Sequence, residues 1–163
     1  MNITFKPADN SDIETVYLLS KDLIDRYENI ENINYDMVLN WIKDKINKSI
    51  NEYASVYLDD KKCGYYHFCR NEEGILEIDD LYIFKEYQNK GIGTYVINNI
   101  LNTINEPVML YVFIGNEKAV SLCRRLGFKV IKNIKDSRYI VEKLFKQTTI
   151  SYKLFNIGIF NHF

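Results

Sequence analysis

Two glycines stand two positions apart where an apolar run gives way to a helical pattern. Gly91 and Gly93 follow the polar stretch 85–90, and apolar residues at helical spacing begin directly after them. Glycine leaves neighbouring backbone amides free of side chains, and the unpaired amides and macrodipole of a helix N-terminus attract phosphate. The amides of residues 89–94 therefore predict a binding site for an anionic ligand.

The common phosphate-binding loops do not fit this segment. A dinucleotide-binding loop needs a third glycine three residues after Gly93, where this chain has Val96. The strand that follows a dinucleotide-binding loop should also end in an acidic residue that binds ribose, whereas the strand that follows here ends in Phe113. The G-x-x-x-x-G-K-[ST] pattern of a P-loop is absent. A helix that merely begins with two glycines is the remaining structural alternative.

Two sequence motifs at a characteristic spacing make the interpretation of the glycine segment more specific. The stretch QNKGIG, from Gln88 to Gly93, resembles the Q/R-x-x-G-x-G/A signature of the GCN5-related N-acetyltransferases, the GNAT family. Downstream, NEKAVSLCRRLGF, from Asn116 to Phe128, is similar to the family's second motif, N-x-x-A-x-x-L-Y-x-x-x-G-F. The opening ITFKPADNSDIE resembles the family's first strand and helix, so the resemblance covers residues 2–145.

This resemblance implies acetyl-CoA as co-substrate and assigns residues to it. A bulged strand before the glycine loop would hold the pantetheine arm through the main chain of Leu81, Tyr82 and Ile83. Asn116 would lie on the pantetheine side of the cofactor. Surface cations at Lys118, Arg124 and Arg125 either help with phosphates or form a solvated face. The pyrophosphate would lie on the glycine loop, which consists of Gln88, Asn89, Lys90, Gly91, Ile92, Gly93 and Thr94.

Acetyl transfer to an amine needs a deprotonated nucleophile, a polarised thioester carbonyl and a proton for the departing thiolate. Glu77 lies eleven positions before Gln88, which matches the position of the base in the histone-acetylating branch of the family. Asp79 shares its strand face by the period of two. Either carboxylate could take the amine proton through water, and a solvated strand edge is the alternative for both. The backbone N–H near Ile83 would stabilise the developing oxyanion.

One position departs from the family pattern. Most relatives have a tyrosine as general acid in the second motif, where this chain has Cys123. A thiol with a pKa of about 8.5 could protonate a thiolate, but its sulfur lies closer to the backbone than a tyrosine hydroxyl. The alternatives are Tyr139, Tyr111, water or no acid at all, with Cys123 as a small buried residue. The departure also motivates a rival function, a catalytically silent acyl-CoA-binding or regulatory module.

The acceptor is a small-molecule or peptide amine, and its site is expected between the first two helices. Residues 25–35, together with the loop 133–137, form the least regular part of the chain. Aromatic and acidic side chains mix there, as a cationic amine would favour, although an ordinary polar loop is the alternative. The candidates are Tyr27, Glu28, Glu31, Tyr35 and Asp36.

The pattern of elements that must position these residues is typical of an α+β fold. It predicts a mixed, mostly antiparallel central sheet with helices on both faces. Ser11 and Glu14 form a capping box that predicts the first helix start, and Trp41 lies on the apolar stripe of the second helix. The expected order is β-α-α-β-β-β-α-β-α-β-β, with strands at 3–5, 53–59, 63–70, 75–84 and 108–113, helices at 91–104 and 116–126, and two final strands after Gly127.

Composition limits the class of protein. The chain has 163 residues with 47% hydrophobic positions, which suits one soluble domain, here residues 1–145. Its 21 Lys and Arg nearly cancel 22 Asp and Glu, which argues against a nucleic-acid or anionic-membrane binder. The apolar extension 146–163 is expected to pack on the same domain or on a second copy in a homodimer.

The cysteine pattern predicts neither a metal centre nor disulfides. Three cysteines without a C-x-x-C pair and only two histidines give no zinc framework of the usual spacing. Reduced thiols in a cytoplasm fit this usage. The sequence start has no apolar signal region, and no run approaches the roughly 18 apolar residues that span a bilayer.

Overall fold

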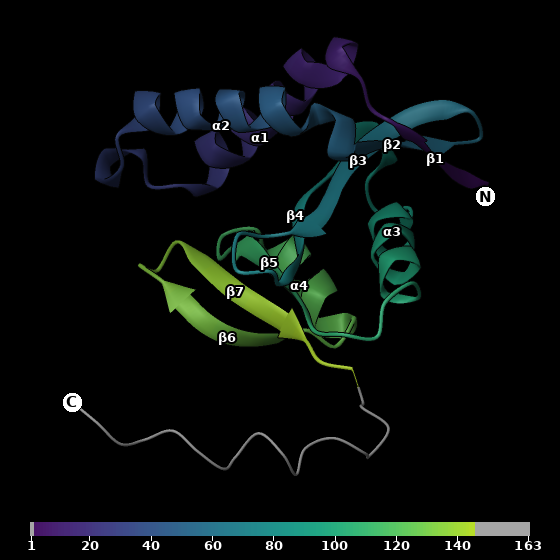
Figure 1. The fold of residues 1–163 in the computed structure, drawn as a ribbon. Helices are drawn as coiled ribbons and strands as arrows, with labels where there is room; N and C mark the ends of the chain where they lie inside the picture. The colour runs from purple at the N-terminus through teal and green to yellow at the C-terminus, as the bar shows by residue number, and fades with distance from the viewer. Residues whose placement is uncertain (1, 146–163) are drawn as a thin grey trace.

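The computed structural model describes residues 2–145. Its helices and strands follow the predicted order (Figure 1). Short 3₁₀ turns precede α1, separate α1 from α2, end α2 and follow β4. The elements are β1 (Ile3–Pro7), α1 (Ile13–Tyr27), α2 (Tyr35–Ser49), β2 (Tyr53–Leu58), β3 (Lys61–Arg70), β4 (Leu76–Ile83), α3 (Ile92–Leu101), β5 (Val108–Phe113), α4 (Glu117–Arg125), β6 (Lys129–Ile134) and β7 (Arg138–Lys143).

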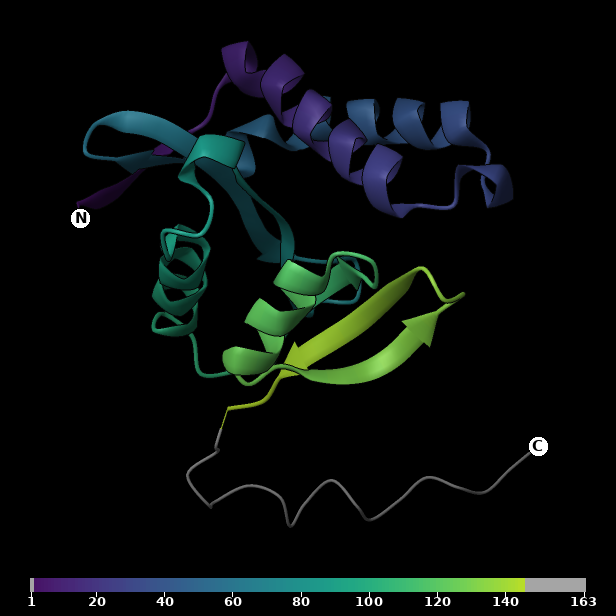
Figure 2. The same cartoon turned by 180° about the vertical axis from the view of Figure 1, so that it is seen from behind.

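The strands form one seven-stranded sheet in the order β1-β2-β3-β4-β5-β7-β6. Neighbouring strands are antiparallel except β4 and β5, which are parallel because α3 connects them. The sheet is therefore mixed and mostly antiparallel, as predicted. Figures 1 and 2 show α1 and α2 at one end of the molecule and the β6–β7 hairpin at the other.

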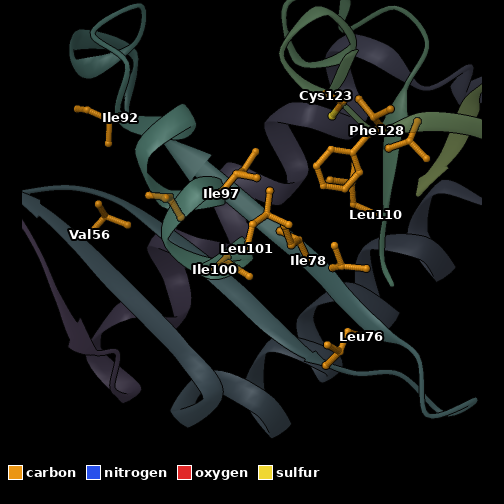
Figure 3. Close-up of a cluster of buried hydrophobic side chains, with 14 of the residues drawn as sticks. Val56, Leu76, Ile78, Ile92, Ile97, Ile100, Leu101, Leu110, Cys123 and Phe128 are labelled. Carbon is orange, nitrogen blue, oxygen red and sulfur yellow. The ribbon is translucent and has the colours of Figure 1, made fainter. Parts of the chain in front are cut away.

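Two apolar clusters lie on opposite faces of the sheet, because alternate residues of a strand point to opposite sides. The helices α1 and α2 cover one face, where Val16, Ile46 and Tyr82 are buried. The helices α3 and α4 cover the other face, where the larger cluster is centred (Figure 3). Its labelled members are Val56, Leu76, Ile78, Ile92, Ile97, Ile100, Leu101, Leu110, Cys123 and Phe128.

Two local predictions were wrong. The first helix is not started by Ser11 and Glu14: Asp9 and Asp12 form the capping box of a 3₁₀ turn at 10–12, and α1 follows it. The Asp9 carboxylate reaches the backbone of this earlier turn and captures the Ser11 side chain as well. Trp41 is 63% exposed rather than in the core, and Lys45 covers its ring at 5.8 Å. The narrower stripe of Ile42 and Ile46 faces the sheet.

Within residues 2–145, no helix has the length and apolar content needed to cross a membrane. The expected docking of the extension 146–163 lies outside the described residues.

Candidate active site

A cleft opens in the sheet between β4 and β5. Their parallel pairing consists of Leu76 with Val108 and Glu77 with Met109, at the start of both strands. A register shift against β3 places His67 opposite Asp80 and Phe68 opposite Ile78, so Asp79 is the extra residue of a β-bulge. The bulge bends β4 away from β5. Beyond Glu77, the β5-facing edge of β4 has no strand partner within the described chain, and Leu81, Tyr82 and Ile83 lie on this edge.

The glycine loop follows this open edge. Gly91 is the N-cap of α3 with φ of +79°, and Asn89 is also left-handed with φ of +60°. Within residues 2–145, the amides of residues 89–94 donate no hydrogen bond to another group of the chain. A Cβ built on Gly91 would meet nothing within 4 Å. Bare amides at a helix N-terminus with open space before them fit a diphosphate.

Two motif side chains position the loop and the next helix. The Gln88 Nε2 donates to the Ile83 carbonyl at 2.9 Å and so fixes the loop against the end of β4. Asn116 is the N-cap of α4, as predicted, and its side chain accepts from the Ala119 amide at 3.3 Å. Lys90 lies over the Tyr87 ring at 5.3 Å. The surface cations Lys118, Arg124 and Arg125 are exposed on α4.

Glu77 is a buried carboxylate at the closed end of the cleft. It alternates with Leu76 and Ile78 of the α3–α4 cluster, so its side chain points to the opposite sheet face. Only 7% of the residue is exposed, and Asn71 donates to its carboxylate at 3.2 Å. Burial raises the pKa of Glu77; the Asn71 hydrogen bond opposes this shift and the charge of Asp79 adds to it. A raised pKa makes this carboxylate a stronger base than an ordinary exposed glutamate.

Asp79 lies on the same face in an opposite electrostatic environment. His67 Nδ1 lies 2.8 Å from its carboxylate and Lys45 Nζ lies 2.6 Å away. Burial acts to raise the pKa of Asp79, but the His67 hydrogen bond and the Lys45 charge outweigh it and lower the pKa. The surroundings of the two predicted carboxylates therefore act in opposite directions. Burial favours the protonated form of Glu77, whereas His67 and Lys45 favour the ionised form of Asp79.

The residues around Asp79 form a polar network that sequence reasoning missed. Lys45 of α2 also contacts Asp80 at 3.2 Å, and the Tyr53 and Tyr82 hydroxyls donate to Asp80. The His67 ring stacks on the Tyr53 ring, with centroids 4.5 Å apart. The available signal was the run E-I-D-D of β4, because successive acids in a buried strand need cations from neighbouring elements.

Cys123 lies in the apolar cluster beside Leu110 and Phe128 (Figure 3). It is 4% exposed, and burial raises its pKa to about 11. A buried thiol of this pKa is a poor proton donor at neutral pH. Of the alternatives, Tyr111 lies on the Glu77 face of the sheet, since it alternates with Leu110 and Val112, whereas Tyr139 packs against the α3–α4 cluster.

The two irregular segments predicted to bind the acceptor meet across the cleft. Glu28 accepts from Ser137 Oγ at 2.7 Å and from Arg138 Nη2 at 2.9 Å. The Tyr27 and Phe113 rings lie 6.0 Å apart, and the Tyr35 hydroxyl donates to Asp25. Glu31 and Asp36 are exposed.

An open pocket lies between α1 and the segment after β4. Its volume is about 430 Å³. Three apolar side chains and five polar ones line it: Leu18, Leu19, Phe84, Thr15, Asp22, Arg26, Lys85 and Glu86. Because Phe84 follows directly after the open edge of β4, the pocket adjoins the cleft.

Comparison with solved structures shows the same fold. PaiA N-acetyltransferase from Thermoplasma acidophilum in complex with coenzyme A is 21% identical, with a TM-score of 0.61 over 89% of this chain and 100% of that one. Arabidopsis thaliana Naa50 with the bisubstrate analogue CoA-Ac-MVNAL is 20% identical, with a TM-score of 0.59 over 89% and 100%. An acetyltransferase from Thermus thermophilus is 12% identical, with a TM-score of 0.66 over 88% and 97%. A search of curated proteins finds no match.

The open edge of β4 and the bare amides of the glycine loop fit the pantetheine arm and diphosphate of a CoA thioester. The sequence matches the model of the acetyltransferase (GNAT) family over residues 16–128. The chain belongs to that family and is an N-acetyltransferase with acetyl-CoA as co-substrate.

Proposed function

We propose that the protein transfers the acetyl group of acetyl-CoA to a primary amine by direct attack in a ternary complex, with Glu77 as the base. The observation that carries the proposal is the buried Glu77 carboxylate, whose pKa is raised, at the closed end of the β4–β5 cleft. A base works best when its pKa approaches the operating pH, and Glu77 meets this condition better than Asp79, whose pKa is lowered.

In the proposed steps, groups of this chain bind acetyl-CoA and activate the acceptor amine. The amides of residues 89–94 hold the diphosphate, and the open edge at Leu81, Tyr82 and Ile83 aligns the pantetheine arm. Acetyl-CoA supplies an acetyl group activated as a thioester. Glu77 takes a proton from the substrate ammonium through water, so that the neutral amine can attack, and the backbone N–H near Ile83 stabilises charge on the carbonyl oxygen.

Attack forms the C–N bond of the amide, and the C–S bond breaks to release CoA thiolate. We propose that this thiolate takes its proton from water and that Cys123 serves only in packing. Two observations support this: Cys123 is buried among apolar side chains, and its pKa is raised to about 11. A thiolate whose conjugate acid has a pKa of about 8.5 leaves without strong acid assistance.

The acceptor is proposed to enter on the α1 side, where the 430 Å³ pocket adjoins the cleft. Apolar Leu18, Leu19 and Phe84 suit a carbon skeleton, while Glu86 offers a carboxylate to an ammonium group. Asp22 is already paired with Arg26. Both small amines and peptide N-termini fit this description. A bisubstrate analogue bound to Naa50 supports a CoA donor and an acceptor that meet in one fold of this kind.

A thiol-release assay with a panel of amines tests the proposal. The panel contains amino acids, polyamines, aminoglycosides and short peptides, and free CoA thiol is monitored with acetyl-CoA present. We expect amine-dependent release that Glu77→Gln reduces. Saturable acetyl-CoA binding with no release by any amine would instead identify a silent acyl-CoA-binding module and overturn the proposed transfer.

A further inference from the structure

Three side chains of different donor type converge where β3 passes the bulge of β4. His67 and Cys69 lie two positions apart on β3 and so point to one sheet face, while Asp79 is the extra residue of the bulge. One ligand atom from each of the three, a ring nitrogen, the sulfur and a carboxylate oxygen, lies within 4.8 Å of the others. His67 Nδ1 is already 2.8 Å from the Asp79 carboxylate.

We infer that this cluster is a zinc site, with His67 Nδ1, Cys69 Sγ and the Asp79 carboxylate as ligands and a water in the fourth position. Imidazole, thiolate and carboxylate are the three side-chain ligands of Zn²⁺, at distances of about 2.0–2.3 Å from the metal. Donor atoms less than 4.8 Å apart reach those distances through small side-chain rotations. A mixed N, S and O set favours zinc over Mg²⁺ or Ca²⁺, which select oxygen.

The far side of His67 has the partner that a zinc-bound histidine needs. Its Nε2 lies 3.3 Å from the carboxylate of Glu52. A metal-ligating histidine usually donates its other ring N–H to a carboxylate, which fixes the ring orientation and the tautomer. The ring is also held by its stack on Tyr53 at 4.5 Å. His67 is therefore oriented with Nδ1 toward Asp79 and Nε2 toward Glu52.

Lys45 is the cation that competes for the same oxygen. Its ammonium lies 2.6 Å from the Asp79 carboxylate and 3.2 Å from that of Asp80. When zinc takes Asp79, the ammonium keeps Asp80 as its partner, so no buried charge is left alone. Glu52 and Glu77 add further negative charge around the cluster, which a divalent cation offsets better than one ammonium.

Metal binding balances without a redox step. The Cys69 thiol and the His67 Nδ1–H, which donates to Asp79 without metal, each give a proton to solvent as the Zn–S and Zn–N bonds form, while the ring keeps its proton on Nε2. The site would join β3 to the bulge of β4. The usual zinc patterns miss it because the ligands form H-x-C in one strand and a lone Asp in the next, which only the sheet register brings together.

Cobalt binding to the chelator-treated protein gives a readout that does not depend on activity. We expect Co²⁺ to produce the visible bands of a tetrahedral ion and a thiolate charge-transfer band, at one ion per chain, which Zn²⁺ then removes by displacement. Cys69→Ser should abolish the charge-transfer band. Cys63→Ser is the matched control, because Cys63 is buried on β3 in the opposite cluster and should keep the band.

Two further variants keep the inference falsifiable if Cys69→Ser does not fold. Glu52→Gln should weaken zinc binding by about 10- to 100-fold, as expected for loss of the carboxylate behind a ligating histidine. Glu117→Gln, which changes an exposed carboxylate on α4, should leave it unchanged. Zinc should raise the melting temperature of the wild-type protein and not that of Asp79→Asn.

A wild-type titration without a charge-transfer band would overturn the site, as would equal bands in Cys69→Ser or unchanged affinity in Glu52→Gln. A consequence that rests on the proposed function is that bound zinc slows acetyl transfer, because it places positive charge beside Glu77. If the amine panel shows no transfer, the cobalt spectra and melting temperatures still decide the zinc site by themselves.

Discussion

Glu77 and Asp79 show how neighbours can give one residue type two roles. Both are carboxylates on one strand face, yet burial holds the pKa of Glu77 up while His67 and Lys45 hold that of Asp79 down. Two carboxylates whose environments push their pKa values apart are the usual sign of a base beside an electrostatic partner. We therefore propose Glu77 as the base because of the side chains around it and not because of its residue type.

Glu77→Gln should lower kcat/KM by about 10²- to 10⁴-fold near pH 7, the range usual for loss of a general base. A base acts only when deprotonated, so wild-type kcat/KM should rise with pH as Glu77 loses its proton. Because the pKa of Glu77 is raised, this rise should lie above the ordinary glutamate value of about 4.3. The pH–rate profile measures it, and the variant should lack this limb and recover at alkaline pH, where solvent deprotonates the amine.

Asp79→Asn serves as the comparison for that profile. Asp79 is ionised throughout the working range, because its pKa is lowered, so the variant should keep the acid limb even where its rate falls. If the acid limb disappears in Asp79→Asn and persists in Glu77→Gln, the roles of the two carboxylates are reversed.

The sequence could indicate Glu77 but not its environment. Its spacing from Gln88 is visible in one strand and loop. The cations that distinguish it from Asp79 come from α2 and β3, and their approach depends on the register shift at His67. The resemblance implied a bulge in this strand but not its position, because a one-residue bulge leaves no clear mark in a pattern of period two. The approach of Lys45 and His67 to Asp79 could therefore not be predicted.

At the scale of elements, we expect the start of α3 to bind phosphate through backbone amides alone. Gly91→Glu should abolish binding of CoA and keep the fold, because a side chain and a negative charge would enter the space before the amides of residues 89–94. Calorimetric titration with CoA measures the loss, and circular dichroism checks the fold.

Two glycine variants separate charge from backbone strain in that experiment. Gly91→Ala places a Cβ at the same φ of +79° without charge, and it should weaken CoA binding much less than Gly91→Glu. Gly74→Glu repeats both the positive φ, +78°, and the open space at a turn away from the cleft, and should not change CoA affinity. Unchanged affinity in Gly91→Glu would contradict the assignment of the loop.

A second glycine sets the distance between β3 and β4. A Cβ on Gly64 would lie 2.1 Å from the Tyr82 carbonyl oxygen, which is backbone and has no room to move. Gly64→Ala should therefore reduce the free energy of unfolding by about 3 kcal/mol or more, the upper end of the range for overpacking. Urea denaturation measures this change.

Gly93→Ala is the matched comparison, with an opposite sign. Its Cβ would lie 3.5 Å from Leu122 Cδ2 of α4, an ordinary van der Waals contact, and alanine is about 1 kcal/mol more favourable than glycine in a helix. We expect this variant to unfold at equal or higher urea concentration than the wild type. Similar losses in both variants would contradict the close approach at Gly64.

Elements were predictable where caps and turns mark their ends. Asn116 starts α4, and Gly127 follows its end with φ of +84°, as the sequence indicated. The start of α1 was misjudged because Asp9, Ser11 and Asp12 are all capable caps, and their competition is decided by backbone geometry. The order of elements was predicted from hydrophobic periodicity and from turn residues. Neither depends on the exact residue at which a helix starts.

On the scale of the whole molecule, the sheet consists of two parts that share an apolar cluster but are joined by only a short stretch of strand pairing. The part β1–β4, covered by α1 and α2, joins the part β5–β7 through the short parallel pair at Leu76 and Glu77. A second link crosses the cleft from the end of α1 to the β6–β7 turn (Figure 2). The sequence placed both segments near the acceptor, but it gave no sign that Glu28 and Arg138 would connect them.

Glu28→Gln should loosen this second link, because its carboxylate bonds both Ser137 and Arg138, and Arg138 in turn covers the Phe113 ring at 4.4 Å. The Glu28 side chain is only 9% exposed, so loss of its charge should reduce the free energy of unfolding by about 1–3 kcal/mol. Amide hydrogen exchange of residues 133–137 should become faster, and KM for the acceptor should rise several-fold. The Kd for CoA should stay within twofold, because the glycine loop lies on another element. Glu106→Gln, which breaks an exposed ion pair with Arg70, should change none of these quantities. An unchanged acceptor KM with faster exchange would show that the link stabilises the fold without shaping the acceptor site.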